Sequence, residues 1–232
     1  IGILAAYTAK EFGDQVQIDL FKFPDDFNTA LRNKVPDFLC MSNYCFNLNL
    51  SYAFVEYVKK SHPEVIIIWG GPNFPTTPEG RKDFMIRHPM IDFYIKWNGE
   101  VALVNLLERL MQYDLKVDRF KKDKIISENC CYFIGNDYIE GPDHRVMDFS
   151  ILPSPYTTGY MDKFFGHSFN PLIETTRGCP YGCTFCNSGH LFNAKIMRKP
   201  KEIIAEELEY IASKVEKTAE LWFCDDNFGM YK

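Results

Sequence analysis

Helical and strand patterns alternate along the first 113 residues, and this alternation constrains the fold more than any other feature. The clearest strand is the run from Val65 to Trp69, which is apolar throughout, mostly β-branched and followed by Gly70-Gly71-Pro72. Further strands are predicted over 16–21, 37–42 and 92–96, and helices over 1–12, 25–33, 48–60, 79–87 and 100–111. Strands that are apolar on both faces are typical of a parallel sheet covered by helices on both sides. The sequence therefore predicts an α/β fold with a doubly wound, Rossmann-like parallel sheet.

The pattern opens with a helix, whereas a doubly wound sheet normally begins with a strand. We therefore expect the first strand and its loop to precede Ile1.

The rest of the chain divides into two further parts. Residues 114–170 are predicted to form a connector with a β-hairpin, because two strand-like runs flank Gly135-Asn136-Asp137. Lys121, Lys122 and Lys124 are predicted to lie in a solvated loop of this connector. Residues 171–232 contain a strand at 172–176, a loop rich in Cys and Gly, a helix at 201–214 and a strand at 221–224. The predicted domains are therefore 1–113, 114–170 and 171–232, the last being one βα unit and the next strand of a barrel or open sheet.

Composition excludes several classes of protein. Of the 232 residues 46% are hydrophobic, and the net charge is −5, which argues against a disordered chain and against a protein that coats nucleic acid. The longest purely apolar run has five residues, Val65 to Trp69, where a membrane helix needs roughly 20, and no export signal is recognisable. We expect a cytoplasmic protein without nucleic-acid or membrane partners. In a reducing compartment, the eight cysteines indicate metal binding or catalysis rather than disulfides.

One loop concentrates three of the cysteines. It reads Arg177-Gly178-Cys179-Pro180-Tyr181-Gly182-Cys183-Thr184-Phe185-Cys186, with the spacing C-x3-C-x2-C. Three thiolates can hold three irons of a cubane cluster and leave the fourth iron for an outside ligand. The two glycines let the backbone wrap closely around sulfur, and Phe185 can shield the cluster from water. The alternative is a zinc site completed by His190 or Cys224, although zinc sites prefer paired C-x2-C knuckles and no second knuckle is present.

The cysteine loop, lying between a strand and a helix, resembles the signature of the radical SAM superfamily. The resemblance implies that Cys179, Cys183 and Cys186 bind a [4Fe-4S] cluster whose open iron is chelated by S-adenosyl-L-methionine. It also implies reductive cleavage of that molecule to a 5′-deoxyadenosyl radical. Phe185 and the segment Asp225-Asp226-Asn227, at the end of the next strand, would then lie on the S-adenosylmethionine and cluster side. The usual Gly-Gly-Glu of that position is absent, and the alternative role of the segment is to cap a helix.

The N-terminal half resembles the cobalamin-binding domain of one radical SAM subgroup. The resemblance rests on residues 36–42, 70–72 and 94–100, which end three strands. Ligands bind such sheets in the crevice outside the carboxyl ends of the strands. The residues thereby implied to bind cobalamin are Ser42, Gly70, Gly71, Pro72, Trp97 and Asn98. The alternative is that Gly-Gly-Pro only turns the chain. The motif Asp-x-His-x-x-Gly, whose His ligates cobalt, would lie in the loop after the first strand.

Together the two resemblances imply a cobalamin-dependent radical SAM enzyme whose partial TIM-type barrel continues beyond Lys232. Methyl transfer to an unactivated carbon or phosphorus centre is the implied reaction, without catalytic residues beyond the cofactor ligands. Its implied partners are a small-molecule or biosynthetic-intermediate substrate and a reducing electron donor such as flavodoxin or ferredoxin. Two alternatives stay open, namely a radical SAM enzyme with non-methylating or lost cobalamin use and a non-enzymatic, zinc-stabilised binding module. Cys40, Cys45 and Cys224 are predicted to be buried apolar residues, and Cys130 and Cys131 are not predicted as ligands.

Overall fold

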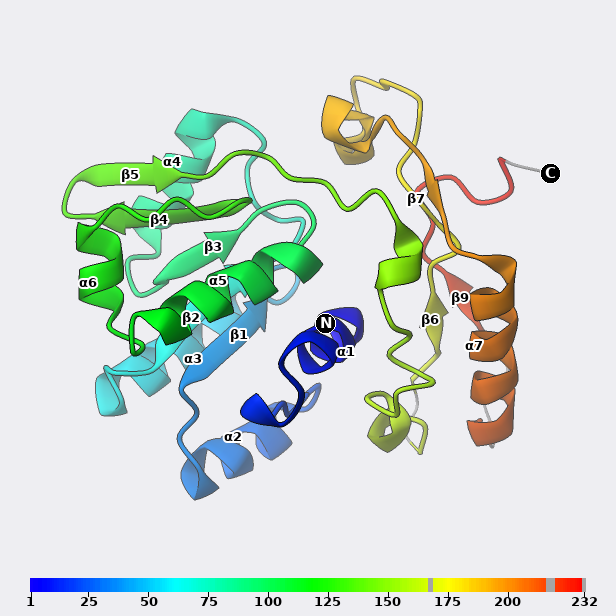
Figure 1. The fold of residues 1–232 in the computed structure, drawn as a ribbon, viewed down its shortest axis with the longest axis horizontal. Helices are drawn as coiled ribbons and strands as arrows, with labels where there is room; N and C mark the ends of the chain where they lie inside the picture. The colour runs from blue at the N-terminus through cyan, green and yellow to red at the C-terminus, as the bar shows by residue number, and fades with distance from the viewer. Residues whose placement is uncertain (167–168, 216–219, 231–232) are drawn as a thin grey trace. The chain divides into compact units, whose positions relative to one another are not determined.

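The structure is a computed structural model that describes residues 1–166, 169–215 and 220–230 (Figure 1). Its contacts separate into two compact units. One unit combines Ile1–Leu20 with Arg145–Lys232, and the other is Phe21–His144. The domain boundaries that the sequence suggests stay a prediction. No helix among the described residues is both long and apolar enough to cross a membrane.

The unit of residues 21–144 is built on a five-stranded sheet in the order β1-β2-β3-β4-β5. Its first three strands run parallel, and β4 and β5 are antiparallel. The strands are β1 (Phe38–Ser42), β2 (Ile66–Gly70), β3 (Phe93–Ile95), β4 (Cys130–Ile134) and β5 (Asp137–Glu140). The α/β prediction is confirmed, with a sheet that is mainly parallel and becomes mixed at the hairpin.

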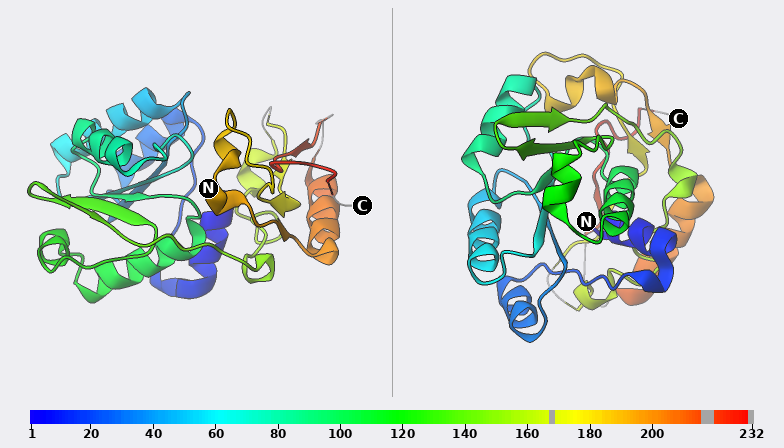
Figure 2. Two further views of the ribbon diagram at one scale, coloured as in Figure 1. Left: turned by 90° about the horizontal axis from the view of Figure 1, so that it is seen from above. Right: turned by 60° about the vertical axis from the view of Figure 1, so that its left-hand side comes forward.

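Helices cover both faces of this sheet. They are α2 (Pro24–Asn33), α3 (Leu48–Ser61), α4 (Pro78–Arg87), α5 (Glu100–Gln112) and α6 (Val117–Lys122). Figure 2 shows α3 and α4 on one side of the sheet and α5 and α6 on the other. Because both faces are covered, every residue from Ile66 to Trp69 is 2% exposed or less. This burial explains why the strand is an unbroken apolar run in the sequence.

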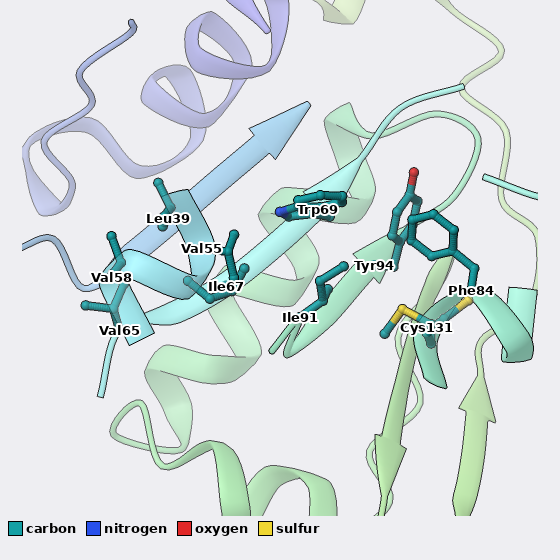
Figure 3. Packing of buried hydrophobic residues seen from close by; sticks show 11 residues of the cluster. Leu39, Val55, Val58, Val65, Ile67, Trp69, Phe84, Ile91, Tyr94 and Cys131 are labelled. Atoms are coloured by element: carbon teal, nitrogen blue, oxygen red, sulfur yellow. The ribbon is translucent and has the colours of Figure 1, made fainter. Parts of the chain in front are cut away.

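The two faces take alternate residues of each strand. Ile67 and Trp69 belong to one core cluster together with Val55 and Val58 of α3 and Tyr94 of β3 (Figure 3). On the opposite face, the ring of Phe93 lies 5.4 Å from Phe120 of α6 and 5.5 Å from Tyr132 of β4, measured between centroids. The sheet therefore lies between two packed layers of side chains, one on each face.

The predicted hairpin is confirmed, and it also extends the sheet, which the sequence did not indicate. Tyr94 and Ile95 of β3 pair with Cys131 and Cys130 of β4. The prediction of a solvated lysine loop is wrong for Lys121, which belongs to α6 and has a side chain only 14% exposed. Its ammonium lies 3.6 Å from the Asp92 carboxylate and over the Phe93 ring, so the aliphatic stem covers apolar surface.

The predicted strand over residues 16–21 is also wrong. Its backbone begins extended, with φ −129° and ψ 140° at Val16, and Leu20 is buried while Gln17 and Asp19 are exposed. The alternation that suggested a strand is therefore real, but the segment pairs with no other strand in the described part of the chain. A strand requires a neighbour for its backbone hydrogen bonds. The expected strand before Ile1 stays a prediction.

The other unit contains α1 (Gly2–Phe12) and the cysteine loop with its flanking elements. These elements are β6 (Leu172–Ile173), β7 (Thr176–Arg177), β8 (Met197–Arg198), α7 (Lys201–Lys214) and β9 (Trp222–Phe223). Short 3-10 helices lie at Gly13–Gln15, Phe149–Ile151, Asp162–Phe164, Asn187–Gly189 and Leu191–Asn193. Since β6 and β9 pair in parallel with α7 between them in sequence, the predicted βα unit and following strand are confirmed. The described residues form no closed barrel.

Candidate functional site

The first group of candidate residues lies at the carboxyl edge of the parallel strands. Ser42 ends β1 and stands in register with Gly70 at the end of β2, which in turn is in register with Ile95 at the end of β3. Gly71 and Pro72 continue from β2, and Trp97 follows β3 by two residues. The structure therefore brings the predicted cobalamin-side residues to one edge of one sheet, where doubly wound proteins bind ligands.

A buried amide organises this edge, and the sequence analysis did not single it out. Asn43, directly after β1, is 0% exposed, and its Nδ2 donates to the Tyr94 hydroxyl at 3.0 Å. The Tyr94 hydroxyl donates to the carbonyl of Gly71 at 3.0 Å, and the Asn73 amide donates to Asn43 Oδ1 at 3.2 Å. These bonds tie the three strand ends to one another. The sequence signal for these two asparagines is only that each lies in the turn after an apolar run, Asn43 after Met41 and Ser42 and Asn73 after Gly70-Gly71-Pro72.

The same contacts explain the second glycine of Gly70-Gly71. Gly71 has φ +130°, and a Cβ there would lie 2.5 Å from the Asn43 carbonyl oxygen. The turn over Asn43 therefore requires glycine whether or not a ligand approaches. Ser42 is better placed for a ligand, because Asn47 Nδ2 donates to its Oγ at 3.2 Å and the hydroxyl proton stays available to an acceptor.

Trp97 adopts a backbone conformation that a bulky residue rarely takes, with φ +58°. Its indole Nε1 donates to Asp143 at 3.0 Å. The next residue, Asn98, is held through its carbonyl by Asn129 Nδ2 at 3.0 Å, and Asn129 is itself 0% exposed. Strained backbone of this kind collects at functional sites, where the surrounding structure must impose it.

A cluster of charged side chains holds the loop after β3, which contains Trp97. The Lys96 ammonium, with a side chain 5% exposed, lies 2.5 Å from both Glu140 and Asp143, and Arg81 makes a bidentate pair with Glu140. Burial alone would raise the pKa of Glu140, but the Lys96 ammonium and the Arg81 guanidinium together lower it. The pKa of Asp143 is lowered in the same way by Lys96, against the effect of burial. Both carboxylates are therefore charged at neutral pH and hold the loop after β3.

The second group of candidates is the cysteine loop, whose entry is tightly packed. Gly178 has φ +99°, and a Cβ there would lie 2.5 Å from the Lys195 carbonyl oxygen and 2.6 Å from that of Asn193. The Cys179 amide donates to the Asn193 carbonyl at 2.9 Å. Arg177, before the glycine, makes a bidentate ion pair with Glu174. The first cysteine is thus placed by backbone contacts that only glycine at position 178 permits.

The other two cysteines project outward. Cys183 and Cys186 are exposed, Cys179 is partly buried, and Phe185 is 91% exposed. Among the residues described, no three His, Cys, Asp or Glu side chains converge so as to hold a metal ion. The assignment of the three thiols as cluster ligands stays a prediction. The predictions of buried cysteines at positions 40, 45 and 224 are wrong, because all three are exposed.

The segment after β9 contacts the cysteine loop and the strand ends before it. Asp225 accepts from the Thr175 amide and hydroxyl at 2.6 and 2.5 Å and from the Thr176 hydroxyl at 2.8 Å. Asp226 accepts from the Gly178 amide at 3.2 Å and from Ser188 Oγ at 2.6 Å. Asn227 Nδ2 donates to Cys179 Sγ at 3.8 Å. The structure therefore places the predicted acidic segment beside the cysteines, as the sequence suggested.

The residues present fit an iron–sulfur cluster by the chemistry of their donor set. One loop supplies three thiols, two of them open to an incoming group, and Asn227 already directs an N–H at one sulfur, a contact that tunes cluster potentials. The carboxyl edge of β1, β2 and β3 fits the tail of an extended polar ligand through the Ser42 hydroxyl. This fit is less specific than that of the three thiols for a cluster.

The zinc alternative finds less support in this geometry. Cys224 Sγ donates to the Ile173 carbonyl at 3.1 Å. His190 Nδ1 accepts from the Phe192 amide at 3.1 Å, within its own 3-10 turn. Both candidates for a fourth ligand therefore have partners in the fold.

Comparisons with known proteins agree with this description. No protein-family model matches the chain. Over 203 residues it is 32% identical to the 2-(S-pantetheinyl)-carbapenam-3-carboxylate methyltransferase of Streptantibioticus cattleyicolor. Over 203 residues it is 31% identical to the cobalamin-dependent radical SAM methyltransferase TokK of Streptomyces tokunonensis. Each alignment covers 84% of this chain and 28% of the relative, so the chain spans less than a third of these proteins.

The fold is shared with a solved structure. The cobalamin-dependent S-adenosylmethionine radical enzyme OxsB, with aqua-cobalamin and S-adenosylmethionine bound, superposes with a TM-score of 0.72. The match covers 98% of this chain and 31% of OxsB at 21% identity. At this identity the likeness concerns the fold, and it includes both units of the chain.

Proposed function

We propose that the chain belongs to the same family as the cobalamin-dependent radical SAM methyltransferase TokK that it matches, and that the protein is itself a cobalamin-dependent radical SAM methyltransferase. The proposed acceptor is an unactivated carbon or phosphorus centre of a small molecule. A reducing electron donor such as flavodoxin or ferredoxin is part of the proposal, as is a cytoplasmic setting.

The observation that carries the proposal is the cysteine loop with the segment that contacts it. Cys179, Cys183 and Cys186 would hold the [4Fe-4S] cluster, with the first sulfur hydrogen-bonded by Asn227. Ser42, Gly70, Gly71, Pro72, Trp97 and Asn98 would line the cobalamin side. When bound, the cluster supplies the electron for cleavage of S-adenosylmethionine, and cobalamin supplies the methyl group.

In this proposal, the chain's own residues position the bound groups. The Asn43 and Tyr94 bonds hold the ends of β1 and β2 in register, so that Ser42 presents a hydroxyl at a defined place. Lys96 and Asp143 hold the Trp97 turn. Phe185, almost fully exposed, is available to cover a bound group and exclude water from it.

The test is metal analysis of the protein purified without oxygen and reconstituted with iron, sulfide and hydroxocobalamin. We expect about four irons per chain, together with cobalt. The matched variants are Cys183→Ala, which should lose the cluster absorbance, and Cys45→Ala, which removes an exposed thiol outside the loop and should retain it. Incubation with S-adenosylmethionine and a reductant should then release 5′-deoxyadenosine.

The alternatives give different outcomes in the same experiment. Iron without cobalt would keep radical SAM chemistry and remove the cobalamin role of the edge after β1 to β3. Zinc without iron would contradict the proposed enzyme and leave a metal-stabilised module. Deoxyadenosine without a methylated product would point to non-methylating use of cobalamin.

A further inference from the structure

The carboxylate of Asp226 joins the two ends of the cysteine loop. Its Oδ2 accepts from the amide of Gly178, the residue before the first cysteine, at 3.2 Å. Its Oδ1 accepts from the hydroxyl of Ser188, two residues after the third cysteine, at 2.6 Å. A single side chain thereby closes the segment that contains all three cysteines.

The loop entry is held from two sides. On one side, Gly178 and Cys179 lie against the backbone of residues 193–195, with the Cys179 amide bonded to the Asn193 carbonyl at 2.9 Å. On the other side, Asp226 binds the Gly178 amide. The exit has a 3-10 turn at Asn187–Gly189, and Gly189 is packed so that a Cβ there would lie 2.4 Å from the Cys183 carbonyl oxygen. Asp226 links these two packed ends.

The neighbouring carboxylate, that of Asp225, binds different residues. Asp225 accepts three hydrogen bonds from Thr175 and Thr176, both of which precede the cysteine loop. Asp225 therefore connects the end of β9 to the strands before the loop, whereas Asp226 acts on the loop itself. The adjacent pair offers a matched comparison, because the two residues share chemistry and location and differ in what they hold.

We propose that Asp226 is a positioning residue that closes the cysteine loop for cluster binding, rather than the carboxylate that receives the ammonium group of S-adenosylmethionine. Both of its oxygens already accept hydrogen bonds within the loop. The inference rests on the proposed function, since the loop must bind a cluster for this closure to matter there.

Substitutions at positions 226 and 188 separate the two roles. Asp226→Ala removes both bonds. Asp226→Asn keeps both, because its Oδ1 accepts from the Gly178 amide and its Nδ2 donates to the Ser188 hydroxyl, but it removes the charge. Ser188→Ala removes one bond, and Ser188→Thr restores the hydroxyl. Asp162→Asn is the control away from the loop, because Asp162 accepts from Tyr210 and Lys214 instead.

The first readout is cluster binding in the intact protein, measured by chelator competition and by the electron paramagnetic resonance spectrum of the reduced cluster. We expect Asp226→Ala to weaken cluster retention about tenfold, as loss of a supporting contact does at metal sites. Asp226→Asn and Ser188→Thr should behave like the wild type, and Ser188→Ala should fall between. Wild-type retention in Asp226→Ala would overturn the proposal. So would an Asp226→Asn protein that keeps its cluster but no longer shows the spectral change caused by S-adenosylmethionine, because the charge would then be the important property.

The second readout needs no cluster. In the iron-free protein, hydrogen exchange of the peptide containing Gly178 should be several-fold faster in Asp226→Ala than in the wild type, and unchanged in Asp226→Asn. Equal exchange in all three proteins would overturn the loop closure itself. A wild-type protein that binds no iron would instead contradict the proposed function, so the two failures are distinguishable.

Discussion

The two units of the molecule hold their functional loops by different means. In residues 21–144, the loops leave a sheet whose central strand is almost fully buried, with Ile67 and Trp69 both 0% exposed. In the cysteine-bearing unit, β6, β7 and β9 have two residues each, and Trp222 and Phe223 of β9 are 56% and 44% exposed. The first site therefore rests on packing and buried polar contacts, and the second on a close backbone contact at Gly178 and a few carboxylate hydrogen bonds. Changes in the first unit should lower the stability of the whole sheet, and changes in the second should act locally.

The largest effect is expected from Gly71→Ala. The added Cβ would lie 2.5 Å from the Asn43 carbonyl oxygen in a backbone conformation at φ +130° that only glycine adopts easily. We expect a loss of about 4 kcal/mol in the free energy of unfolding, measured by urea denaturation. The matched control is Gly135→Ala, where φ is +56° but no atom lies within 4 Å of the added Cβ, so only about 1 kcal/mol of strain applies. Equal losses in both proteins would show that packing against Asn43 is not the cause.

The second largest loss of stability is expected from Glu140→Gln. It leaves the buried Lys96 and Arg81 without their shared carboxylate, and breaking such a pair costs about 3 kcal/mol. Urea denaturation measures the change. Asp137→Asn is the control, because Asp137 pairs with Lys124 on the surface and both side chains are more than half exposed. If the two variants unfold at the same urea concentration, the buried ion pairs of Glu140 do not stabilise the fold more than a surface pair does.

The same cluster predicts a pH dependence. Since the pKa of Glu140 is lowered in the folded protein, its contribution to stability is present above the ordinary value of 4.5 and is lost as the pH falls through the lowered value. Asp143, also lowered, adds to this in the same direction. The stability difference between the wild type and Glu140→Gln should therefore shrink towards zero as unfolding is measured at successively lower pH below the ordinary value of 4.5. A difference that stays constant across this range would assign the effect to packing.

A smaller and more local effect is expected in the cysteine-bearing unit. Asp225→Ala removes three hydrogen bonds from Thr175 and Thr176, which we expect to cost about 2 kcal/mol in local opening. The amide of Cys224 reports on it, because this amide bonds the Ile173 carbonyl across the β6–β9 pair at 2.9 Å. Hydrogen exchange at Cys224 should accelerate while exchange at Ile67 stays unchanged. Faster exchange at both positions would mean that the variant destabilises the whole chain.

Much of the secondary structure and the location of both candidate sites followed from local sequence. The apolar run at 65–69 and the helix at 201–214 are confirmed because their signals, β-branched continuity and helical periodicity, are local. The cysteine spacing and the strand-ending motifs are local signals too, and the site residues assigned from them stay predictions. The strand expected at 16–21 failed because pairing is not a local property, and Lys121 was misplaced because its burial depends on Asp92 and Phe93, distant in sequence.

The sequence by itself determined the alternation of elements, the parallel sheet and the three-cysteine loop, since each is carried by neighbouring residues. Only the tertiary structure decided that the hairpin extends the sheet and that Asn43 ties three strand ends together. It also decided that Asp225 and Asp226, adjacent in the chain, bind different partners. These outcomes depend on hydrogen bonds between residues that are 23 to 51 positions apart, such as Tyr94 with Gly71 and Asn43 with Tyr94. The role of each of these side chains therefore depends on which hydrogen-bond donors the fold brings close to it.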